Sequence, residues 1–339
     1  MIKYLNIIFV LIGIVLSQAA RSQDPQFSQY NASPLLIAPS FAGNSLGSRA
    51  FVNFRDQWAK LPGSYVTYSV AYDHNFYAIN SGLGIVCMRD VAGTARLGTT
   101  TLTGLYSYRF NMNDSWRIRP GISFTYAQRS LQFSRAIFPD QISETGTDPI
   151  TVEQGTRPYY YWDAASSVVV YNRTMYFGLA VDHLVRPNTS FARLDARTPM
   201  QWSQFGGINF PMMNRVGKAP EVISVNYLFK MSADYRQIDI GANWYRAPLL
   251  LGLAWRGLPS KDYPSYDALI FTVGIAFNNM AIGYSYDFTV SKLGPATGGS
   301  HEVTFSISFN EGGKKQRKGS IPCPDVVRFK MFGDKESFR

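Results

Sequence analysis

Apolar and polar residues alternate in segments of about ten residues, each followed by a turn, from Arg49 to Asn310. The segment Met280–Val290 shows this most clearly, with large apolar residues at every second position and Ala, Gly, Ser, Asp or Thr between them. Because successive side chains of a β-strand point to opposite faces, each segment predicts a strand with one apolar face. A soluble β-sandwich shows the same alternation. The repetition, the segment length and the aromatic ends favour a β-barrel in the outer membrane of a Gram-negative bacterium.

The pattern predicts fourteen strands, an even number that allows a bacterial single-chain barrel to close. They span residues 49–58, 64–73, 81–91, 99–110, 115–126, 161–172, 174–184, 203–212, 221–231, 235–245, 248–256, 266–277, 279–290 and 301–310. Closure is required because an open sheet edge in lipid would leave backbone N–H and C=O groups unpaired. The fold class is therefore all-β, a transmembrane antiparallel barrel of about 14 strands.

The connections between these segments support the same topology. Turns after even-numbered strands are mostly short, as at 111–114 and 246–247, although 74–80 and 213–220 are longer. The longest connections, 127–160 and 185–202, follow odd-numbered strands. Since outer-membrane barrels have short periplasmic turns and longer extracellular loops, both chain termini are expected in the periplasm.

The two faces of several strands can be assigned from the alternation. Residues expected to face lipid are Leu269, Phe271, Val273, Ile275 and Phe277, Val303, Phe305, Ile307 and Phe309, and Ile238, Ile240, Ala242 and Trp244. Gln237, Asp239, Gly241 and Asn243 fall on the opposite face and predict a wet or tightly packed lumen.

Three segments lie outside the predicted barrel of residues 49–310. Residues 1–23 have a Lys, an apolar run and then small residues, which is typical of a signal peptide. Residues 24–48 contain three prolines and alternate poorly, so we expect a periplasmic arm, either extended or tucked into the barrel mouth. Residues 311–339 form a basic tail, which is either a solvated extension or a periplasmic docking segment.

The amino-acid composition limits which functions the chain can have. Aromatic residues make up 15% of the chain, as expected for the aromatic girdles of a barrel. The net charge of +10 could indicate nucleic-acid binding, but an exported β-protein does not meet nucleic acid. We therefore expect the basic side chains to face water in the lumen, lipid head groups or an acidic partner. The two cysteines, Cys87 and Cys323, are too few for a disulfide framework, and their pairing stays open.

No motif in the sequence argues for catalysis, a cofactor or a metal. Gly43–Gly47 matches the G-x-S-x-G pattern of hydrolases but precedes the first strand, without the helix that this mechanism needs. The three histidines, His74, His183 and His301, are not spaced as metal ligands. We therefore expect a protein that is not an enzyme.

The start of the mature chain carries a set of motifs that occur together. Asp24–Tyr30 reads DPQFSQY, Pro34, Ala38-Pro39 and Ala42-Gly43 follow, and Arg55–Trp58 reads RDQW. With further matches up to Asp140-Gln141, this resembles the PorP/SprF family of outer-membrane proteins. The sequence has Ser33-Pro34 and Ala38-Pro39-Ser40 where the family usually has Asn-Pro and Asn-Pro-Ala.

The resemblance implies a role in the type IX secretion system and, in some members, in gliding motility. Such proteins dock secreted cargo with type B C-terminal domains, such as cell-surface adhesins, or anchor periplasmic secretion subunits. The residues expected to bind partners are Gln26, Phe27, Gln29, Tyr30, Arg55, Gln57, Trp58, Phe329, Lys330 and Phe332. Arg55 and Trp58 would alternatively anchor the barrel at the membrane interface.

The rival interpretation is a passive channel or a transporter of small solutes or fatty acids. A transporter predicts an open lumen with a constriction of solute size, whereas a docking protein predicts a lumen plugged by the arm or by loops.

Overall fold

The computed structural model describes residues 24–45, 47–131, 158–191, 195–212, 221–233, 235–259, 265–277, 279–291 and 294–309. These residues form one antiparallel sheet and four short 3-10 helices. The described part of the chain contains no helix that is long and apolar enough to cross a membrane.

Fifteen strands are found among the described residues. They are β1 (Ser48–Gln57), β2 (Tyr65–Phe76), β3 (Ser81–Ala92), β4 (Leu97–Tyr108), β5 (Phe110–Asn111), β6 (Arg117–Ser130), β7 (Tyr159–Tyr171), β8 (Met175–Asp182), β9 (Gln201–Met212), β10 (Glu221–Ser232), β11 (Tyr235–Arg246), β12 (Leu249–Leu258), β13 (Ser265–Phe277), β14 (Met280–Thr289) and β15 (Ser300–Phe309). The 3-10 helices are η1 (Pro34–Leu36), η2 (Pro39–Phe41), η3 (Tyr77–Ile79) and η6 (Pro295–Thr297).

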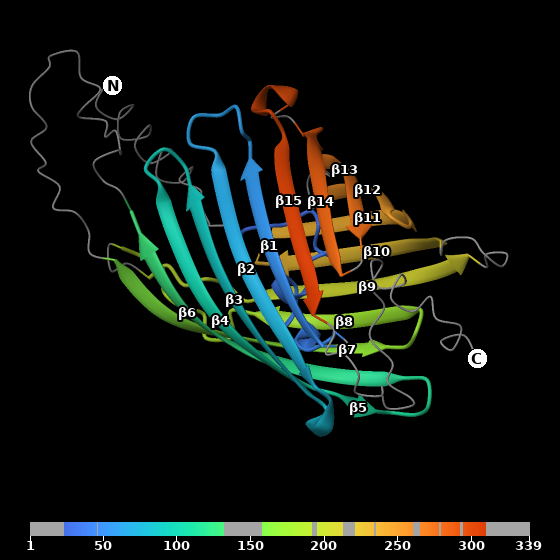
Figure 1. The fold of residues 1–339 in the computed structure, drawn as a ribbon. Coiled ribbons are helices and arrows are strands. Elements are labelled where there is room, and N and C mark those ends of the chain that lie inside the picture. The colour runs from blue at the N-terminus through green and yellow to red at the C-terminus, as the bar shows by residue number, and fades with distance from the viewer. Residues whose placement is uncertain are drawn as a thin grey trace, which may run out of the picture.

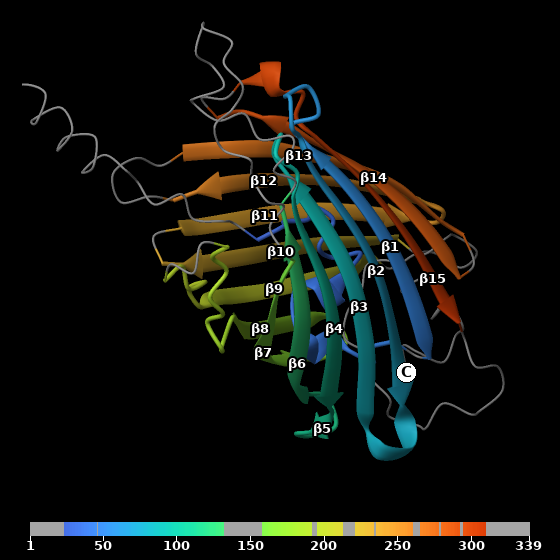
Figure 2. The same ribbon diagram turned by 90° about the vertical axis from the view of Figure 1, so that its left-hand side faces the viewer.

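The sheet closes into a barrel of fourteen strands. Strands that follow one another in sequence pair with each other, except β4 and β5, and β4 pairs with β6 instead. β1 pairs with β15 from Ser48↔Phe309 to Gln57↔Ser300. In Figure 1, β1–β4 cross one wall steeply while β7–β11 run nearly horizontally across the other, and Figure 2 shows the same two walls from the side. The predicted fold class is confirmed.

The two-residue strand β5 continues β4 after a short interruption. The β4–β6 register stops at Ser107↔Gly121 and resumes at Phe110↔Ile118 on β5. Pro120 is the next residue of β6 in this register. Proline has no N–H to donate to a neighbouring strand, so the pairing of β4 with β6 stops there. One predicted strand, 99–110, therefore appears as two elements.

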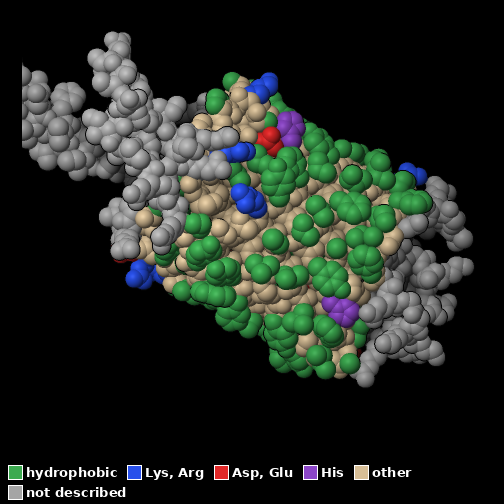
Figure 3. All heavy atoms as spheres, turned by 60° about the vertical axis from the view of Figure 1, so that its left-hand side comes forward, with side chains coloured by type: hydrophobic (Ala, Val, Ile, Leu, Met, Phe, Trp, Pro, Cys, Tyr) green, Lys and Arg blue, Asp and Glu red, His purple; other side chains and the backbone are tan. Residues whose placement is uncertain are grey.

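The side chains separate by face as the alternation predicted. On β13, Phe271, Val273, Ile275 and Phe277 are exposed, while Ile270 and Ala276 on the opposite face are buried. On β11, Gln237 and Asp239 are buried inside, whereas Ile240 faces out. Hydrophobic side chains cover the outer face in Figure 3, and the few charged ones lie near its ends. This apolar band is the surface that contacts lipid.

The strand connections divide into two sets at opposite ends of the barrel. The turns between β7 and β8, β11 and β12, and β13 and β14 take two or three residues at one end. At the other end the connections after β6, β8 and β14 are much longer, and only the β10–β11 connection, of two residues, is as short. We refer to these as the short-turn end and the long-connection end. The strands alternate in direction, so Ser48 and Phe309 lie at the short-turn end, and Gln57 and Ser300 at the other.

A charge on the lipid face should destabilise the barrel in proportion to its depth. Phe271→Arg puts a guanidinium into the middle of β13, and we expect a loss of about 2–4 kcal/mol in the free energy of unfolding. Tyr266→Arg, on the same face close to the end of β13, should lose only about 0–1 kcal/mol. Denaturant titration in phospholipid vesicles measures both; equal losses would contradict the assignment of this face to hydrocarbon.

Candidate functional site

Residues 24–45 lie inside the barrel, and we refer to them as the plug. Their polar contacts reach strands on all sides: the Ser28 hydroxyl donates to Asp287 on β14, and the Ser40 N–H donates to Ser167 on β7. On β4 and β6, Ser107 and Arg119 both donate to the carbonyl of Ala42. Figures 1 and 2 show the blue ribbon of the plug, with η1 and η2, between the two walls.

The plug runs through the lumen from one end to the other. Asp24 contacts His183, which directly follows β8 at the long-connection end, at 2.8 Å between Oδ2 and Nε2. Asn75, close to the turn after β2 at the short-turn end, donates to the carbonyl of Ser45 at 2.7 Å. Asp24 and Phe309 therefore lie at opposite ends of the barrel. The sides faced by residues 1–23 and 310–339 stay a prediction, because both segments lie outside the described residues.

The half of the plug that leads into β1 packs as an apolar core. Leu35, Ala38, Phe41 and Ala42 are buried in one cluster with wall residues from β1–β4 and β7–β10. The Phe41 ring lies 5.2 Å from that of Phe205. Both 3-10 helices begin at a proline, whose fixed φ suits the first helical position. Burial of these side chains fixes residues 33–45 in the lumen.

Two glycines on the wall make room for the plug backbone. A Cβ on Gly82 would lie 2.2 Å from the carbonyl oxygen of Ala42, and one on Gly121 would lie 2.3 Å from the nitrogen of Ser40. Both neighbours are backbone atoms, which cannot rotate away. Gly43 of the plug has φ +61° and faces Gly82 at the same point. The wall and the plug are therefore complementary at the level of the main chain.

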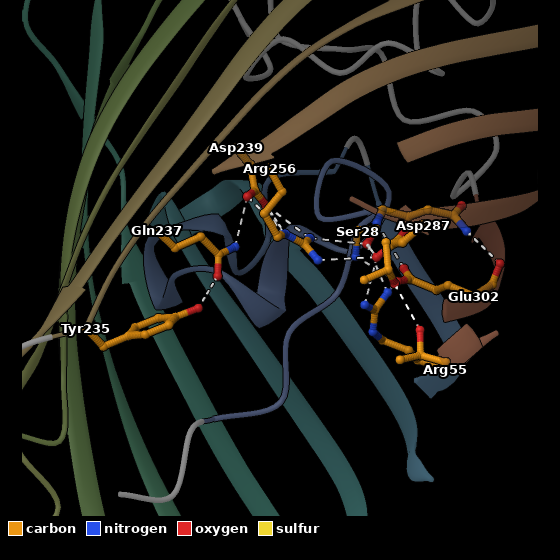
Figure 4. Close-up of polar contacts among 11 residues, drawn as sticks. Ser28, Arg55, Tyr235, Gln237, Asp239, Arg256, Asp287 and Glu302 are labelled. Atoms are coloured by element: carbon orange, nitrogen blue, oxygen red, sulfur yellow. Dashed lines mark hydrogen bonds and ion pairs between the residues drawn. The ribbon is translucent and has the colours of Figure 1, made fainter. Parts of the chain in front are cut away.

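The other half of the plug enters a buried network of charges (Figure 4). Arg55 of β1 contacts Asp287 of β14 at 2.8 Å and Glu302 of β15 at 3.1 Å. Arg256 of β12 contacts Asp287 at 3.2 Å and Asp239 of β11 at 3.0 Å. The five side chains are each 4% exposed or less, so the network is isolated from bulk water.

Ser28 and Gln29 complete this network from the plug. The backbone N–H groups of Ser28 and Gln29 donate to the two carboxylate oxygens of Glu302, at 2.7 and 3.0 Å. The Ser28 hydroxyl donates to Asp287 at 2.6 Å and accepts from Arg55 and Arg256. Removing two ions from water costs several kcal/mol each unless their remaining hydrogen-bonding positions are filled. The plug fills those positions.

A second set of polar contacts holds Asp24, at the start of the plug. His183 donates to Asp24 and to Asp163 of β7, with its Nδ1 2.5 Å from Asp163 Oδ2. Burial lowers the pKa of His183, but the hydrogen bonds to the two carboxylates and their charges outweigh it and raise the pKa to about 10. Burial raises the pKa of Asp24, but the hydrogen bond and charge of His183 prevail, and the net shift is downward. The pair is thus charged at neutral pH.

Cavities remain beside the plug. One of about 110 Å³ lies between Ser28–Ala32 and the small inward residues of β11–β15, among them Gly241, Thr272 and Thr304. Another, of about 240 Å³, lies between plug residues Asp24, Pro25, Phe27 and 35–39 and the strands β3, β4, β6 and β7. Among the described residues no group of three or more potential metal ligands occurs.

The residues predicted to bind partners fall into three groups. Gln26, Phe27, Gln29, Tyr30 and Arg55 meet inside the lumen, where Gln26 donates to Tyr235 at 2.8 Å and Phe27 and Tyr30 are buried. Gln57 and Trp58 lie at the long-connection end. The backbone N–H of Trp58 donates to the carbonyl of Gly299, and the centroid of its ring lies 5.2 Å from that of Tyr65. Phe329, Lys330 and Phe332 lie outside the described residues.

The sequence pattern alone did not mark Asp239, Arg256, Asp287 or Glu302 as site residues. Each lies at an inward position of its strand, and a charge at an inward position is compatible with water in the lumen. A signal was present, since carboxylates and guanidiniums occur at similar heights on β1, β11, β12, β14 and β15. Cys87 faces outward and is unpaired in the structure, and Cys323 lies outside the described residues.

The comparison with known families decides the identity. The family model for the type IX secretion system membrane protein PorP/SprF matches residues 19–307. The chain belongs to the PorP/SprF family. The resemblance of the N-terminal motifs is confirmed, and the match covers the barrel far beyond residue 140. This PorP/SprF protein is therefore an outer-membrane β-barrel of a family associated with type IX secretion.

Comparisons with other known proteins give only distant similarities. No curated protein matches the chain. A mutant of the monoaromatic hydrocarbon channel TodX is 11% identical over 82% of this chain and 94% of its own, with a TM-score of 0.42. A FadL homologue from Pseudomonas aeruginosa is 11% identical (77% and 88% covered, TM-score 0.38), and the KdgM porin is 9% identical (77% and 99%, TM-score 0.34). We infer no function from similarities this low.

Removal of Arg55 should destabilise the barrel strongly. Arg55→Ala removes a positive charge and its hydrogen bonds from Asp287 and Glu302, while both carboxylates stay buried. We expect a loss of about 3–5 kcal/mol in the free energy of unfolding. Arg197→Ala, which breaks the exposed pair with Asp195, should lose under about 1 kcal/mol. Chemical denaturation compares the variants; a small loss for Arg55→Ala would contradict a sealed network.

The contact of Asp24 with His183 should depend on pH. The pKa of His183 is raised from 6.5 to about 10, so its contribution to stability is complete below pH 6.5 and is lost as the pH rises through about 10. The pKa of Asp24 is lowered from 3.8, so its contribution is present above that pH and is lost in acid. The difference in unfolding free energy between wild type and His183→Ala should therefore shrink from pH 6.5 to 10. A difference that stays constant would contradict the pairing.

Proposed function

We propose that this PorP/SprF protein is a docking component of the type IX secretion system and not an open channel. It binds secreted cargo with type B C-terminal domains, such as a surface adhesin used in gliding motility, or anchors periplasmic secretion subunits. The observation that supports this is the plug, which occupies the lumen from end to end. A passive channel requires a continuous aqueous path, and a plug held by buried charges and an apolar core opposes one.

The two ends of the barrel suit different partners in this proposal. The long connections face the cell exterior and meet cargo, while the short turns and the segment after Phe309 face the periplasm and meet the secretion machinery. Long extracellular loops and short periplasmic turns are the common arrangement in outer-membrane barrels. The outer apolar band binds membrane lipid. We propose no catalytic activity and no nucleic-acid partner for this protein.

Single-channel recording tests whether the plug seals the lumen. We expect the purified protein to show no steady conductance in planar bilayers. Gly121→Val should produce a steady conductance, because the valine side chain would overlap the backbone of Ser40 and displace the plug. Gly104→Val is the matched control, since a Cβ on Gly104 meets nothing within 4 Å. A steady large conductance of the wild type would contradict the docking proposal and favour the transporter.

Deletion of the gene tests the role in secretion. Loss of one class of surface adhesin, with the permeability to small solutes unchanged, is the expected outcome. Normal export together with slower solute uptake would contradict it.

A further inference from the structure

The two halves of the plug are held by different kinds of contact. Residues 33–45 are buried in an apolar cluster and fit against glycines of the wall. Residues 24–32 make hydrogen bonds and ion pairs at Asp24, Gln26, Ser28 and Gln29, and only Tyr30 among them joins the apolar cluster. Hydrogen bonds with one ligand can be replaced by equivalent hydrogen bonds with another at little net cost in free energy. Residues 24–32 are therefore the part of the plug that another ligand can replace.

The wall recognises the main chain of this replaceable half. Glu302 accepts from two consecutive backbone N–H groups, and Gln29 donates from its side-chain amide back to the Glu302 carbonyl. A carboxylate that accepts from adjacent backbone groups binds any polypeptide with free N–H groups at those positions. Side chains of this half are also recognised: the Ser28 hydroxyl fits between Asp287 and the two arginines, and Gln26 donates to Tyr235.

There is space in the lumen around the same residues. The cavity of about 110 Å³ is lined by Ser28–Ala32 on one side of the plug. The cavity of about 240 Å³ is lined by Asp24, Pro25 and Phe27 together with residues 35–39. Thr304 is buried, lines the first cavity and has a hydroxyl without a hydrogen-bond partner. The lumen here could hold an occupant bulkier than residues 24–32 without a change in the wall.

We propose that this part of the lumen is a binding site for an extended polypeptide, occupied in the structure by the chain's own residues 24–32. An extended segment of a secreted partner binds there in their place. It offers two consecutive backbone N–H groups to Glu302 and a small hydroxyl side chain to Asp287, Arg55 and Arg256. This inference rests on the proposed docking function and identifies the part of the partner that the barrel holds.

The test uses a fluorescent nonapeptide with the sequence of residues 24–32 and the full-length protein in detergent. Ser28→Pro weakens the resident segment, since proline lacks both the N–H and the hydroxyl, while every wall residue stays intact. We expect the peptide to bind this variant saturably by fluorescence anisotropy. The same peptide with proline in place of its serine should bind roughly tenfold more weakly, because it lacks two charge-assisted hydrogen bonds.

Three controls accompany the peptide-binding experiment. Wild-type protein should bind the peptide weakly, because its own tethered segment competes at a high effective concentration. Glu302→Gln combined with Ser28→Pro should reduce binding of the native peptide toward that of the proline peptide. Ser28→Ala keeps the N–H and provides a second weakened variant if Ser28→Pro does not fold, as judged by the heat-dependent shift of barrels on gels. Equal binding of the native and proline peptides to the weakened variants would overturn the proposal.

The failure of this inference can be distinguished from failure of the proposed function. If gene deletion abolishes adhesin export but the two peptides bind alike, the barrel docks its partners elsewhere and only the lumen site is wrong. If deletion leaves export intact, the docking function itself is wrong, whatever the peptides do.

Discussion

Hydrocarbon offers no hydrogen-bond partner to a peptide group, so the edges of every lipid-exposed strand must be paired within the protein. The pairing of β1 with β15 and of β4 with β6 meets this requirement by closing the sheet. Closure then creates an interior, and the alternation of the strands lines it with residues such as Asp239 and Glu302. The same constraint that directs Phe271 and Phe305 to lipid thus collects charges in the lumen. Those charges need water or protein partners.

The plug provides these partners. Arg55 and Arg256 are too few to balance Asp239, Asp287 and Glu302, and the backbone of Ser28 and Gln29 supplies the remaining donors. The apolar half of the plug is held by packing, because Phe41 and its neighbours are buried against the wall. The barrel and residues 24–45 therefore pack as one unit, in which a polar half of the plug lies next to an apolar half.

The fourteen strands and their faces could be predicted because a period of two is a local property of the sequence. The break at Pro120 was missed, since it depends on the register with β4. The course of the plug was not predictable, because Ser28 and Glu302 are 274 positions apart and an inward carboxylate has the same pattern whether it faces water or a peptide. The family motifs drew attention to Gln26–Tyr30 and Arg55, and the structure brings these residues together. It gives them contacts within the chain that no spacing had indicated.

The most direct measurement of the plug's course is the side of the membrane from which Asp24 can be reached. Cells would carry Asp24→Cys, Lys60→Cys or Ile79→Cys in a chain whose Cys87 and Cys323 are replaced by alanine. Lys60 marks the long-connection end, and Ile79, which is 61% exposed, marks the short-turn end. We expect a membrane-impermeant maleimide to label Asp24→Cys from the same side as Lys60→Cys and from the opposite side to Ile79→Cys. Labelling of Asp24→Cys from the side of Ile79→Cys would contradict a plug that spans the lumen.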